Sequence, residues 1–377
     1  MNEKLNKRKK LLIDILSIQT ASGNEFDMIA YIKDFCTEFV PKAKVKIKDN
    51  NIYVTKGKSK TYPCIVAHTD TVHEIHKYYK VFDDDGCIFA FNSQTGNQVG
   101  VGGDDKVGIW IALQMLLRED NIKCAFFHSE EIGCIGSGQA DMKWFKDVGY
   151  CFQADRRGNT DFINSISGKL YSKAFKKTVK LIIAHYGYKE TSGAITDVGQ
   201  LAENGIGVCV ANMSCGYYSP HSDQEVVIFE HANNCLNMVE TLVEELGCNK
   251  YEYQYENKWT DFGTYNGYNG QWGDFAGASR RYWYGDNDYG TANTDVVIDE
   301  VSGEPTCYYC GGNDLRESEY GDEYRYCMQC ITDIYCADTL EESKDPNQVE
   351  IDYEDISDSY DDSTEHKTIV NNYLKKK

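Results

Sequence analysis

Long hydrophobic runs are missing from this sequence, because no segment approaches the roughly 18 consecutive apolar residues that a membrane-spanning helix needs. An excess of positive charge is missing as well: 39 Lys and Arg stand against 59 Asp and Glu, which argues against binding to a phosphate backbone. The first ten residues are charged and precede an amphipathic stretch, unlike the apolar core of a secretory signal. We therefore expect a cytoplasmic protein that binds neither membranes nor nucleic acids.

Aliphatic residues are scarce in the last third of the chain. Residues 251–377 carry 28 acidic and 10 basic side chains, whereas residues 1–250 carry 31 and 29. The nearly neutral first part is long enough to build one core, but the acidic second part cannot build another of that size. We predict a folded domain over 1–250, a Tyr/Gly/Asn-rich low-complexity linker over 251–303, a small cysteine-bearing module over 304–337 and an acidic disordered tail over 338–377.

The fifteen cysteines do not predict a disulfide framework. Most of them stand singly inside apolar runs, where a reduced thiol acts as a small hydrophobic side chain. Examples are Cys64, Cys124, Cys151 and Cys209. This usage is typical of a reducing compartment and agrees with a cytoplasmic location.

Four later cysteines have a different pattern. Cys307 and Cys310 are separated by sixteen residues from Cys327 and Cys330, and two C-x₂-C pairs at this distance are typical of a structural zinc site. Chance spacing in a cysteine-rich chain is the alternative. The pattern predicts a four-cysteine zinc ribbon that holds one Zn²⁺, and its acidic surroundings favour a protein partner for the ribbon or the tail.

Apolar strands and amphipathic helices alternate through the first 250 residues. Short runs without charge predict buried strands at 62–67, 150–154 and 207–211, with a further strand at 123–127. Helical spacing of apolar residues predicts helices at 26–39, 106–117, 174–186 and 231–246. This alternation predicts a three-layer α/β/α fold with a mostly parallel or mixed central sheet, in which sites gather outside the carboxyl ends of the strands.

Potential metal ligands stand at or after these strands and in two loops. They are His68, Asp70, Asp104, Glu130, Glu131, Asp155 and His221. Each motif alone is weak, since a histidine at a strand end is often a core residue and an Asp-Asp pair before a helix often caps it. Together, two histidines and several carboxylates are the ligands that two neighbouring zinc ions need, with one carboxylate as a bridge.

Residues 8–246 resemble the co-catalytic zinc peptidases of the M20 family and its M28 and M42 relatives. The resemblance rests on five motifs in the family's order. They are His68-Thr-Asp70, Gly103-Asp-Asp-Lys-Val-Gly, Ser129-Glu-Glu-Ile-Gly, Asp155 and Pro220-His221. It implies a zinc exopeptidase-like fold with two zinc ions in the active site.

The resemblance also implies a role for each ligand. His68 and Asp155 would hold one zinc ion, Glu131 and His221 would hold the other, and Asp104 would bridge them. Neighbouring residues point in different directions, so one glutamate of a pair can bind metal while the other faces the attacking water.

Two further carboxylates take catalytic roles by the same resemblance: Asp70 would fix the imidazole of His68, and Glu130 would be the general base. The implied activity is that of a metal-dependent hydrolase, an aminopeptidase or di/tripeptidase that acts on short peptides. An N-acyl amino acid deacylase of the same fold is an alternative. A non-catalytic binding protein that uses the ribbon and the tail is another.

One departure from the M20 pattern concerns the lid domain. Only 65 residues separate Asp155 from His221, too few for the domain that M20 members usually insert there for dimerisation and for an oxyanion-stabilising histidine. We therefore expect a monomer rather than the family's usual dimer. Tyr217, Tyr218 and Arg156 are the candidates for stabilising the oxyanion or binding substrate.

Overall fold

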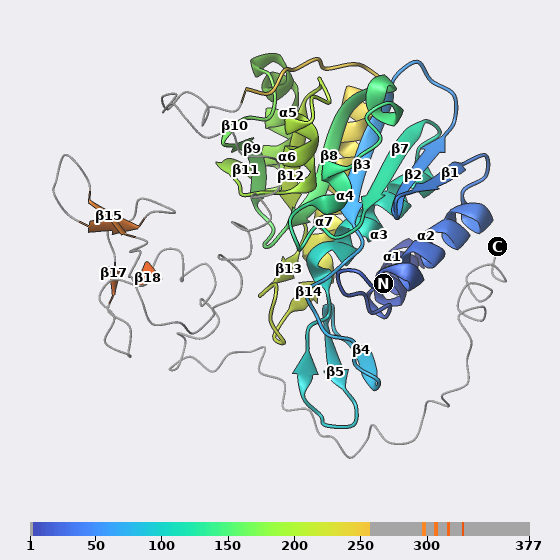
Figure 1. Ribbon diagram of the computed structural model, residues 1–377, viewed down its shortest axis with the longest axis vertical. Coiled ribbons are helices and arrows are strands. Elements are labelled where there is room, and N and C mark those ends of the chain that lie inside the picture. Colours follow the sequence, from blue (N-terminus) through green and yellow to red (C-terminus); the bar gives the residue numbers. More distant parts are fainter. Residues whose placement is uncertain (1–2, 257–295, 299–304, 308–314, 317–325, 328–377) are drawn as a thin grey trace, which may run out of the picture. The chain divides into compact units, whose positions relative to one another are not determined.

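A nine-stranded mixed sheet forms the centre of the computed structural model, which describes residues 3–256 and short strands at 296–298, 305–307, 315–316 and 326–327 (Figure 1). The strands follow the order β1-β2-β7-β3-β8-β12-β9-β10, and β11 pairs with β9. Four central strands run parallel, namely β7 (Ile122–Phe127), β3 (Tyr62–His68), β8 (Val148–Arg156) and β12 (Val210–Ser214). The flanking strands are β1 (Lys44–Lys48), β2 (Asn51–Lys56), β9 (Asp161–Ile166), β10 (Gly168–Lys169) and β11 (Lys189–Ser192).

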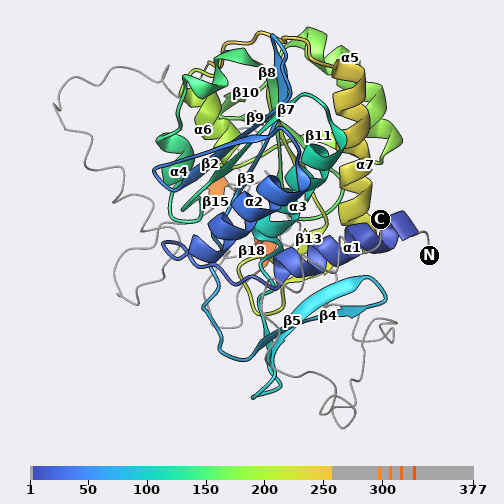
Figure 2. The ribbon, with the colours of Figure 1, turned by 90° about the vertical axis from the view of Figure 1, so that its right-hand side faces the viewer.

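Helices cover both faces of this sheet. Helix α3 packs against β3, β7 and β8 on one face together with α7, whereas α4 and α6 lie on the other (Figure 2). The helices are α1 (Glu3–Leu16), α2 (Phe26–Phe39), α3 (Gly103–Arg118), α4 (Ile135–Gly138), α5 (Lys173–His185), α6 (Asp197–Glu203) and α7 (Phe229–Leu246), with a 3₁₀ turn at Trp144–Asp147. The predicted three-layer α/β/α fold with a mixed sheet is confirmed.

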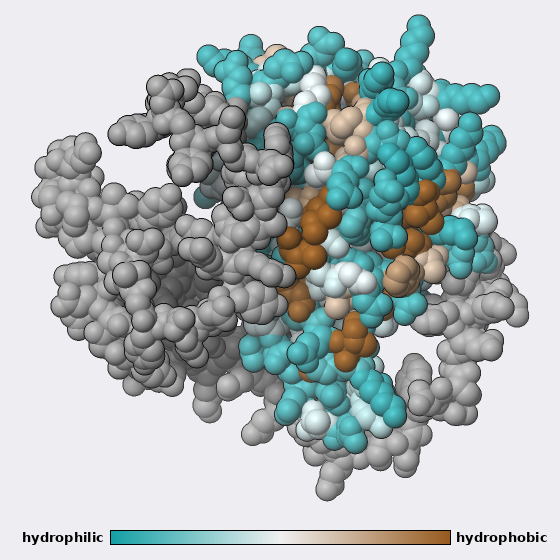
Figure 3. All heavy atoms as spheres, in the orientation of Figure 1, coloured by the Kyte–Doolittle hydropathy of each residue, from teal (hydrophilic) through white to brown (hydrophobic). Residues whose placement is uncertain are grey.

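The central strands are buried because helices cover both of their faces. Every residue of β3 and of β7 is buried, as expected for parallel strands of this kind. Within residues 3–256 all ten cysteines are free thiols, and most of them are buried. None of the helices in the described ranges is both long and apolar enough to cross a membrane. The surface seen in Figure 3 is mostly hydrophilic, with a few apolar spots.

A second, five-stranded sheet lies beside the large one and was not predicted from the sequence. It comprises β4 (Tyr79–Asp84), β5 (Cys87–Asn92), β6 (Gln98–Val99), β13 (Tyr217–Tyr218) and β14 (Val226–Ile228). β13 pairs antiparallel with β14, with Tyr217 opposite Val227. The turn that carries His221 therefore lies between two paired strands, which restrict its position.

Residues 251–256, which follow the predicted end of the folded domain, pack against it. The Tyr251 N–H donates to the Gly149 carbonyl at 2.9 Å, and the Tyr251 carbonyl accepts from the Cys209 N–H at 2.8 Å. The Tyr251 ring contacts those of Tyr150 and Phe175, at centroid distances of 5.8 and 5.2 Å. We call residues 251–256 the tyrosine strap; it lies at the amino ends of β8 and β12.

We expect a chain that ends at Lys250 to be less stable than one that ends at Glu256. Loss of the strap removes several hydrogen bonds and two aromatic contacts, which together contribute about 2–4 kcal/mol to the free energy of unfolding. Urea denaturation of both chains and of the full-length protein measures this difference. Equal midpoints for the two shorter chains would show that the strap does not stabilise the domain.

The second compact unit of the chain spans Arg281–Lys377. Within it, β15 (Val296–Ile298) pairs with β16 (Pro305–Cys307), and β17 (Leu315–Arg316) pairs with β18 (Tyr326–Cys327), both antiparallel. Cys307 and Cys327 thus end short strands. Cys310, Cys330, most of the predicted linker and the acidic tail lie outside the described residues, so the zinc ribbon remains a prediction.

Candidate metal centre

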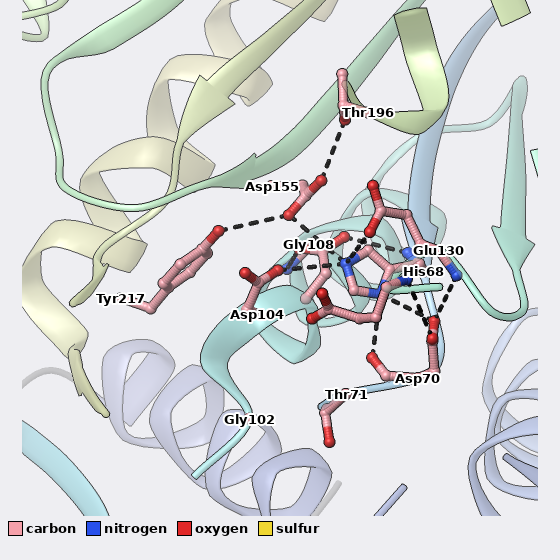
Figure 4. Close-up of polar contacts among 12 residues, drawn as sticks. His68, Asp70, Thr71, Gly102, Asp104, Gly108, Glu130, Asp155, Thr196 and Tyr217 are labelled. Atoms are coloured by element: carbon pink, nitrogen blue, oxygen red, sulfur yellow. Dashed lines mark hydrogen bonds and ion pairs between the residues drawn. The ribbon is translucent and has the colours of Figure 1, made fainter. Parts of the chain in front are cut away.

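The motif residues meet at the carboxyl ends of the parallel strands (Figure 4). His68 is the last residue of β3 and Asp155 the penultimate residue of β8. Glu130 and Glu131 follow β7, and Asp104 stands in the first turn of α3. Because parallel strands all end at one edge of the sheet, side chains that are distant in the sequence become neighbours.

Asp104 lies between the two histidines. Its Oδ1 is 3.2 Å from His68 Nε2, and its Oδ2 is 3.3 Å from His221 Nε2. The side chain of His68 is 1% exposed and that of His221 is 28% exposed. One carboxylate therefore faces both imidazoles with separate oxygen atoms, which is the arrangement that a bridging ligand needs.

Two groups of potential ligands share Asp104. The first joins it to His68 and Asp155, and the second to Glu131 and His221; in each group the ligand atoms lie within 4.8 Å of one another. Glu131 Oε2 is 3.1 Å from His221 Nε2, whereas its buried Oε1 has no hydrogen-bond partner in the described part of the chain. A buried oxygen without a donor fits a cation, and the nitrogen and oxygen donors suit zinc.

The electrostatics of the centre also favour a cation. Burial opposes protonation of His68, but its hydrogen bonds to Asp104, Asp155 and Asp70 outweigh this effect and hold the pKa of His68 well above its ordinary value. For His221, burial likewise opposes protonation, but Asp104 and Glu131 raise the pKa to about 11. In both cases the neighbouring carboxylates stabilise a positive charge on the imidazole ring. When the histidines are neutral, divalent ions bound between them and the carboxylates supply the positive charge instead.

Asp70 contacts both the ring of His68 and the backbone of the Glu130-Glu131 pair. Its Oδ1 is 3.3 Å from His68 Nδ1 and accepts from the Glu130 N–H at 2.9 Å. Its Oδ2 accepts from the Glu131 N–H at 3.2 Å and from the Ser22 hydroxyl at 2.7 Å. Asp70 thus orients the ring so that Nε2 faces Asp104, and it also holds the backbone of the glutamate pair.

The two residues of the Asp-Asp pair in the first turn of α3 have different contacts. Asp104 faces the histidines, whereas Asp105 Oδ1 accepts from the Gly108 N–H at 3.0 Å, as a helix cap does. Asp105 Oδ2 also accepts from the His68 N–H at 3.2 Å. The capping interpretation therefore applies to Asp105 and the ligand interpretation to Asp104.

Glu225 holds the backbone at the start of α3, a role that was not predicted from the sequence. It is fully buried. Its Oε1 accepts from the Asp104 N–H at 3.0 Å, and its Oε2 accepts from the Gly102 N–H at 2.7 Å and lies 2.7 Å from His73 Nε2. The sequence places Glu225 in the loop of His221, but this position does not predict a contact with the backbone N–H groups of Gly102 and Asp104.

Asp155 is held by three further residues that were not predicted from the sequence. Its Oδ2 accepts from Gln153 Nε2 at 3.0 Å and from the Thr196 hydroxyl at 3.1 Å. Asn212 accepts from the Asp155 N–H through Oδ1 at 3.0 Å and donates to the Asp155 carbonyl through Nδ2 at 2.8 Å. These contacts leave Oδ1 of Asp155 on the side of His68, at 3.6 Å from Nε2.

The three oxyanion or substrate candidates differ in their contacts. The buried Tyr217 directs its hydroxyl toward Asp155 Oδ1 at 3.5 Å (Figure 4). The Tyr218 hydroxyl lies 2.8 Å from His231 Nδ1, and Arg156 Nε donates to Asp161 at 2.7 Å. Tyr217 is therefore the candidate whose hydroxyl contacts the centre.

No protein-family model and no curated protein matches this sequence. Solved structures do match the fold. One is an aminopeptidase PepT from Bacillus cereus, with a TM-score of 0.55 and 12% identity over 64% of this chain and 98% of the other. Another is a tripeptidase from Staphylococcus aureus, with a TM-score of 0.52 and 13% identity over the same shares. The chain therefore has the fold of these two peptidases.

Proposed function

We propose that this protein is a two-zinc metallopeptidase that hydrolyses short peptides, as an aminopeptidase or a di/tripeptidase of the M20 type and its relatives. The observation that carries the proposal is the position of Asp104, which faces His68 and His221 with separate oxygens. Support also comes from the fold shared with an aminopeptidase and a tripeptidase. The proposal also includes the predicted division of the chain into a catalytic domain, a linker, a zinc ribbon and an acidic tail, with a third zinc ion in the ribbon.

His68, Asp104 and Asp155 would hold one zinc ion, and Asp104, Glu131 and His221 the other. When bound, the two ions polarise the scissile carbonyl and lower the pKa of water. Asp70, whose Oδ1 is 3.3 Å from His68 Nδ1, keeps Nε2 of His68 directed at the centre.

Glu130 is the general base of the proposed reaction. Burial raises the pKa of its carboxyl well above the ordinary value, which makes the carboxylate a stronger proton acceptor. It removes a proton from the attacking water and then gives that proton to the leaving nitrogen. Tyr217, whose hydroxyl lies 3.5 Å from Asp155 Oδ1, would donate a hydrogen bond to the carbonyl oxygen as negative charge develops there.

Hydrolysis by the full-length chain, measured with and without a chelator, tests the proposal. We expect cleavage of di- and tripeptides that disappears with the chelator and returns with added Zn²⁺. Metal analysis should give three zinc ions per chain, two in the centre and one in the ribbon. Cleavage of N-acyl amino acids alone would favour a deacylase, and no cleavage of either class by the zinc-loaded protein would favour a non-catalytic binding protein.

A further inference from the structure

The loop that carries the two glutamates is held by side chains from three other parts of the chain. Four consecutive N–H groups, those of residues 128–131, each donate to a side-chain oxygen. The acceptors are Asn51 Oδ1 for His128 at 3.2 Å, Glu25 Oε1 for Ser129 at 3.2 Å, and the two oxygens of Asp70 for Glu130 and Glu131 at 2.9 and 3.2 Å. These contacts restrict the backbone on both sides of Glu130.

The three accepting side chains are buried and stand at the ends of different elements. Asn51 is the first residue of β2, Glu25 directly precedes α2, and Asp70 follows the end of β3 by two residues. Their exposed fractions are 0%, 4% and 0%. A buried acceptor that loses its donor retains the cost of desolvation, so each of these contacts opposes a movement of the loop.

The carbonyl groups of the same loop are bound within the loop itself. The carbonyls of His128 and Ser129 accept from the N–H groups of Gly136 and Ile135 at 3.0 and 3.1 Å, and the Glu130 carbonyl accepts from those of Gly133 and Cys134 at 2.9 and 2.8 Å. The loop therefore closes on itself through its carbonyls and is bound to the rest of the domain through its N–H groups.

Glu25 binds the loop at the residue where the backbone turns. Ser129 has a φ of +53°, in the left-handed region that residues with a Cβ rarely adopt. Glu25 Oε1 accepts from both the N–H and the hydroxyl of Ser129, at 3.2 and 3.3 Å, and from the Gly23 N–H at 3.0 Å. An unfavourable conformation persists only where its surroundings hold it. Loss of this carboxylate should let Ser129 relax and turn the side chain of Glu130, which follows it.

We propose that Glu25 is a positioning residue of the reaction, which directs the carboxylate of Glu130 to the attacking water through the backbone of Ser129. The inference rests on the proposed peptidase function. Glu130 Oε2 is 4.0 Å from His68 Nε2 (Figure 4), and a displacement of about 1 Å in such a centre can cost about 10²-fold in rate. Glu25→Ala should therefore lower kcat by about 10- to 100-fold.

The test measures kcat, KM and zinc content for the zinc-loaded full-length chain with a tripeptide substrate. Glu25→Ala should lower kcat and leave KM and the zinc content unchanged, because Asp70 still holds the N–H groups of Glu130 and Glu131. Glu25→Gln offers an oxygen to the Ser129 N–H and should recover most of the lost kcat. Glu38→Ala, at an exposed position of α2, is the matched control and should change none of the three.

A double variant separates positioning of the base from a general loss of structure. In Glu130→Gln the base is already absent, so the addition of Glu25→Ala should leave the remaining kcat unchanged. Two residues that act through one group give such non-additive losses, whereas independent effects on kcat would multiply.

The possible failures are distinguishable. An unchanged kcat in Glu25→Ala, equal losses in Glu25→Ala and Glu25→Gln, multiplied losses in the double variant or a loss of zinc would each overturn the role of Glu25 and leave the peptidase function standing. If Glu25→Ala does not fold, Glu25→Asp, which keeps the charge but is one methylene shorter, takes its place in the same comparisons. No hydrolysis of any tripeptide by the unchanged chain would overturn the proposed function, and the positioning role with it.

Discussion

Replacing Glu130 by glutamine should lower kcat for peptide hydrolysis by about 10²- to 10⁴-fold, with the zinc content unchanged. Glutamine has the size of glutamate but cannot take a proton from water. The backbone of residue 130 should stay in place, because its N–H donates to Asp70. The expected loss therefore measures proton transfer rather than the geometry of the centre.

The surroundings of Glu130 distinguish it from Glu131. Glu130 Oε2 is 4.0 Å from His68 Nε2, and its Oε1 accepts from the Cys134 thiol at 3.4 Å. Glu131 instead contacts His221 at 3.1 Å and belongs to a ligand group. We therefore expect Glu131→Gln to reduce the zinc content, whereas Glu130→Gln should not.

The measurement combines steady-state kinetics with metal analysis of the same preparation. Glu38→Gln, at an exposed position of α2, is the control and should keep both kcat and zinc. An unchanged kcat in Glu130→Gln would contradict the assignment of the base. Loss of a zinc ion from that variant would show instead that Glu130 is a ligand.

The ligand candidates could be predicted from the sequence because each stands in a recognisable local pattern. His68 follows an uncharged run that forms β3, and Asp155 lies near the end of the run that forms β8. Parallel strands ending at one edge of a sheet then bring such residues together without any information on long-range contacts. The same argument accounts for the successful prediction of the three layers.

The supporting residues could not be predicted in this way, because their partners are distant in the sequence. Thr196 donates to Asp155 from the start of α6, and no local pattern relates the two. The tyrosine strap shows a related difficulty: its composition resembles that of a disordered linker, yet the Tyr251 ring packs on Tyr150 and Phe175. Whether a tyrosine-rich segment packs depends on the surface that it meets, which composition does not describe.

Replacing Glu225 by alanine should lower the free energy of unfolding by about 3–5 kcal/mol, as expected when one partner of a buried charged contact is removed. Without this carboxylate, the N–H groups of Gly102 and Asp104 and the ring of His73 lose their acceptor. Unpaired donors in a buried site retain the full cost of desolvation. Urea denaturation of the full-length chain measures the change.

Activity should fall together with stability, because Glu225 holds the backbone of the bridging residue. The Asp104 N–H donates to Glu225 Oε1 at 3.0 Å, so a shift of this backbone moves both oxygens that face the histidines. Glu225→Gln retains one acceptor oxygen and should lose less stability than Glu225→Ala. Glu230→Ala, at an exposed position of α7, is the control. If Glu225→Ala kept the zinc content, kcat and urea midpoint of the unchanged chain, the position of Asp104 would not depend on this buried carboxylate.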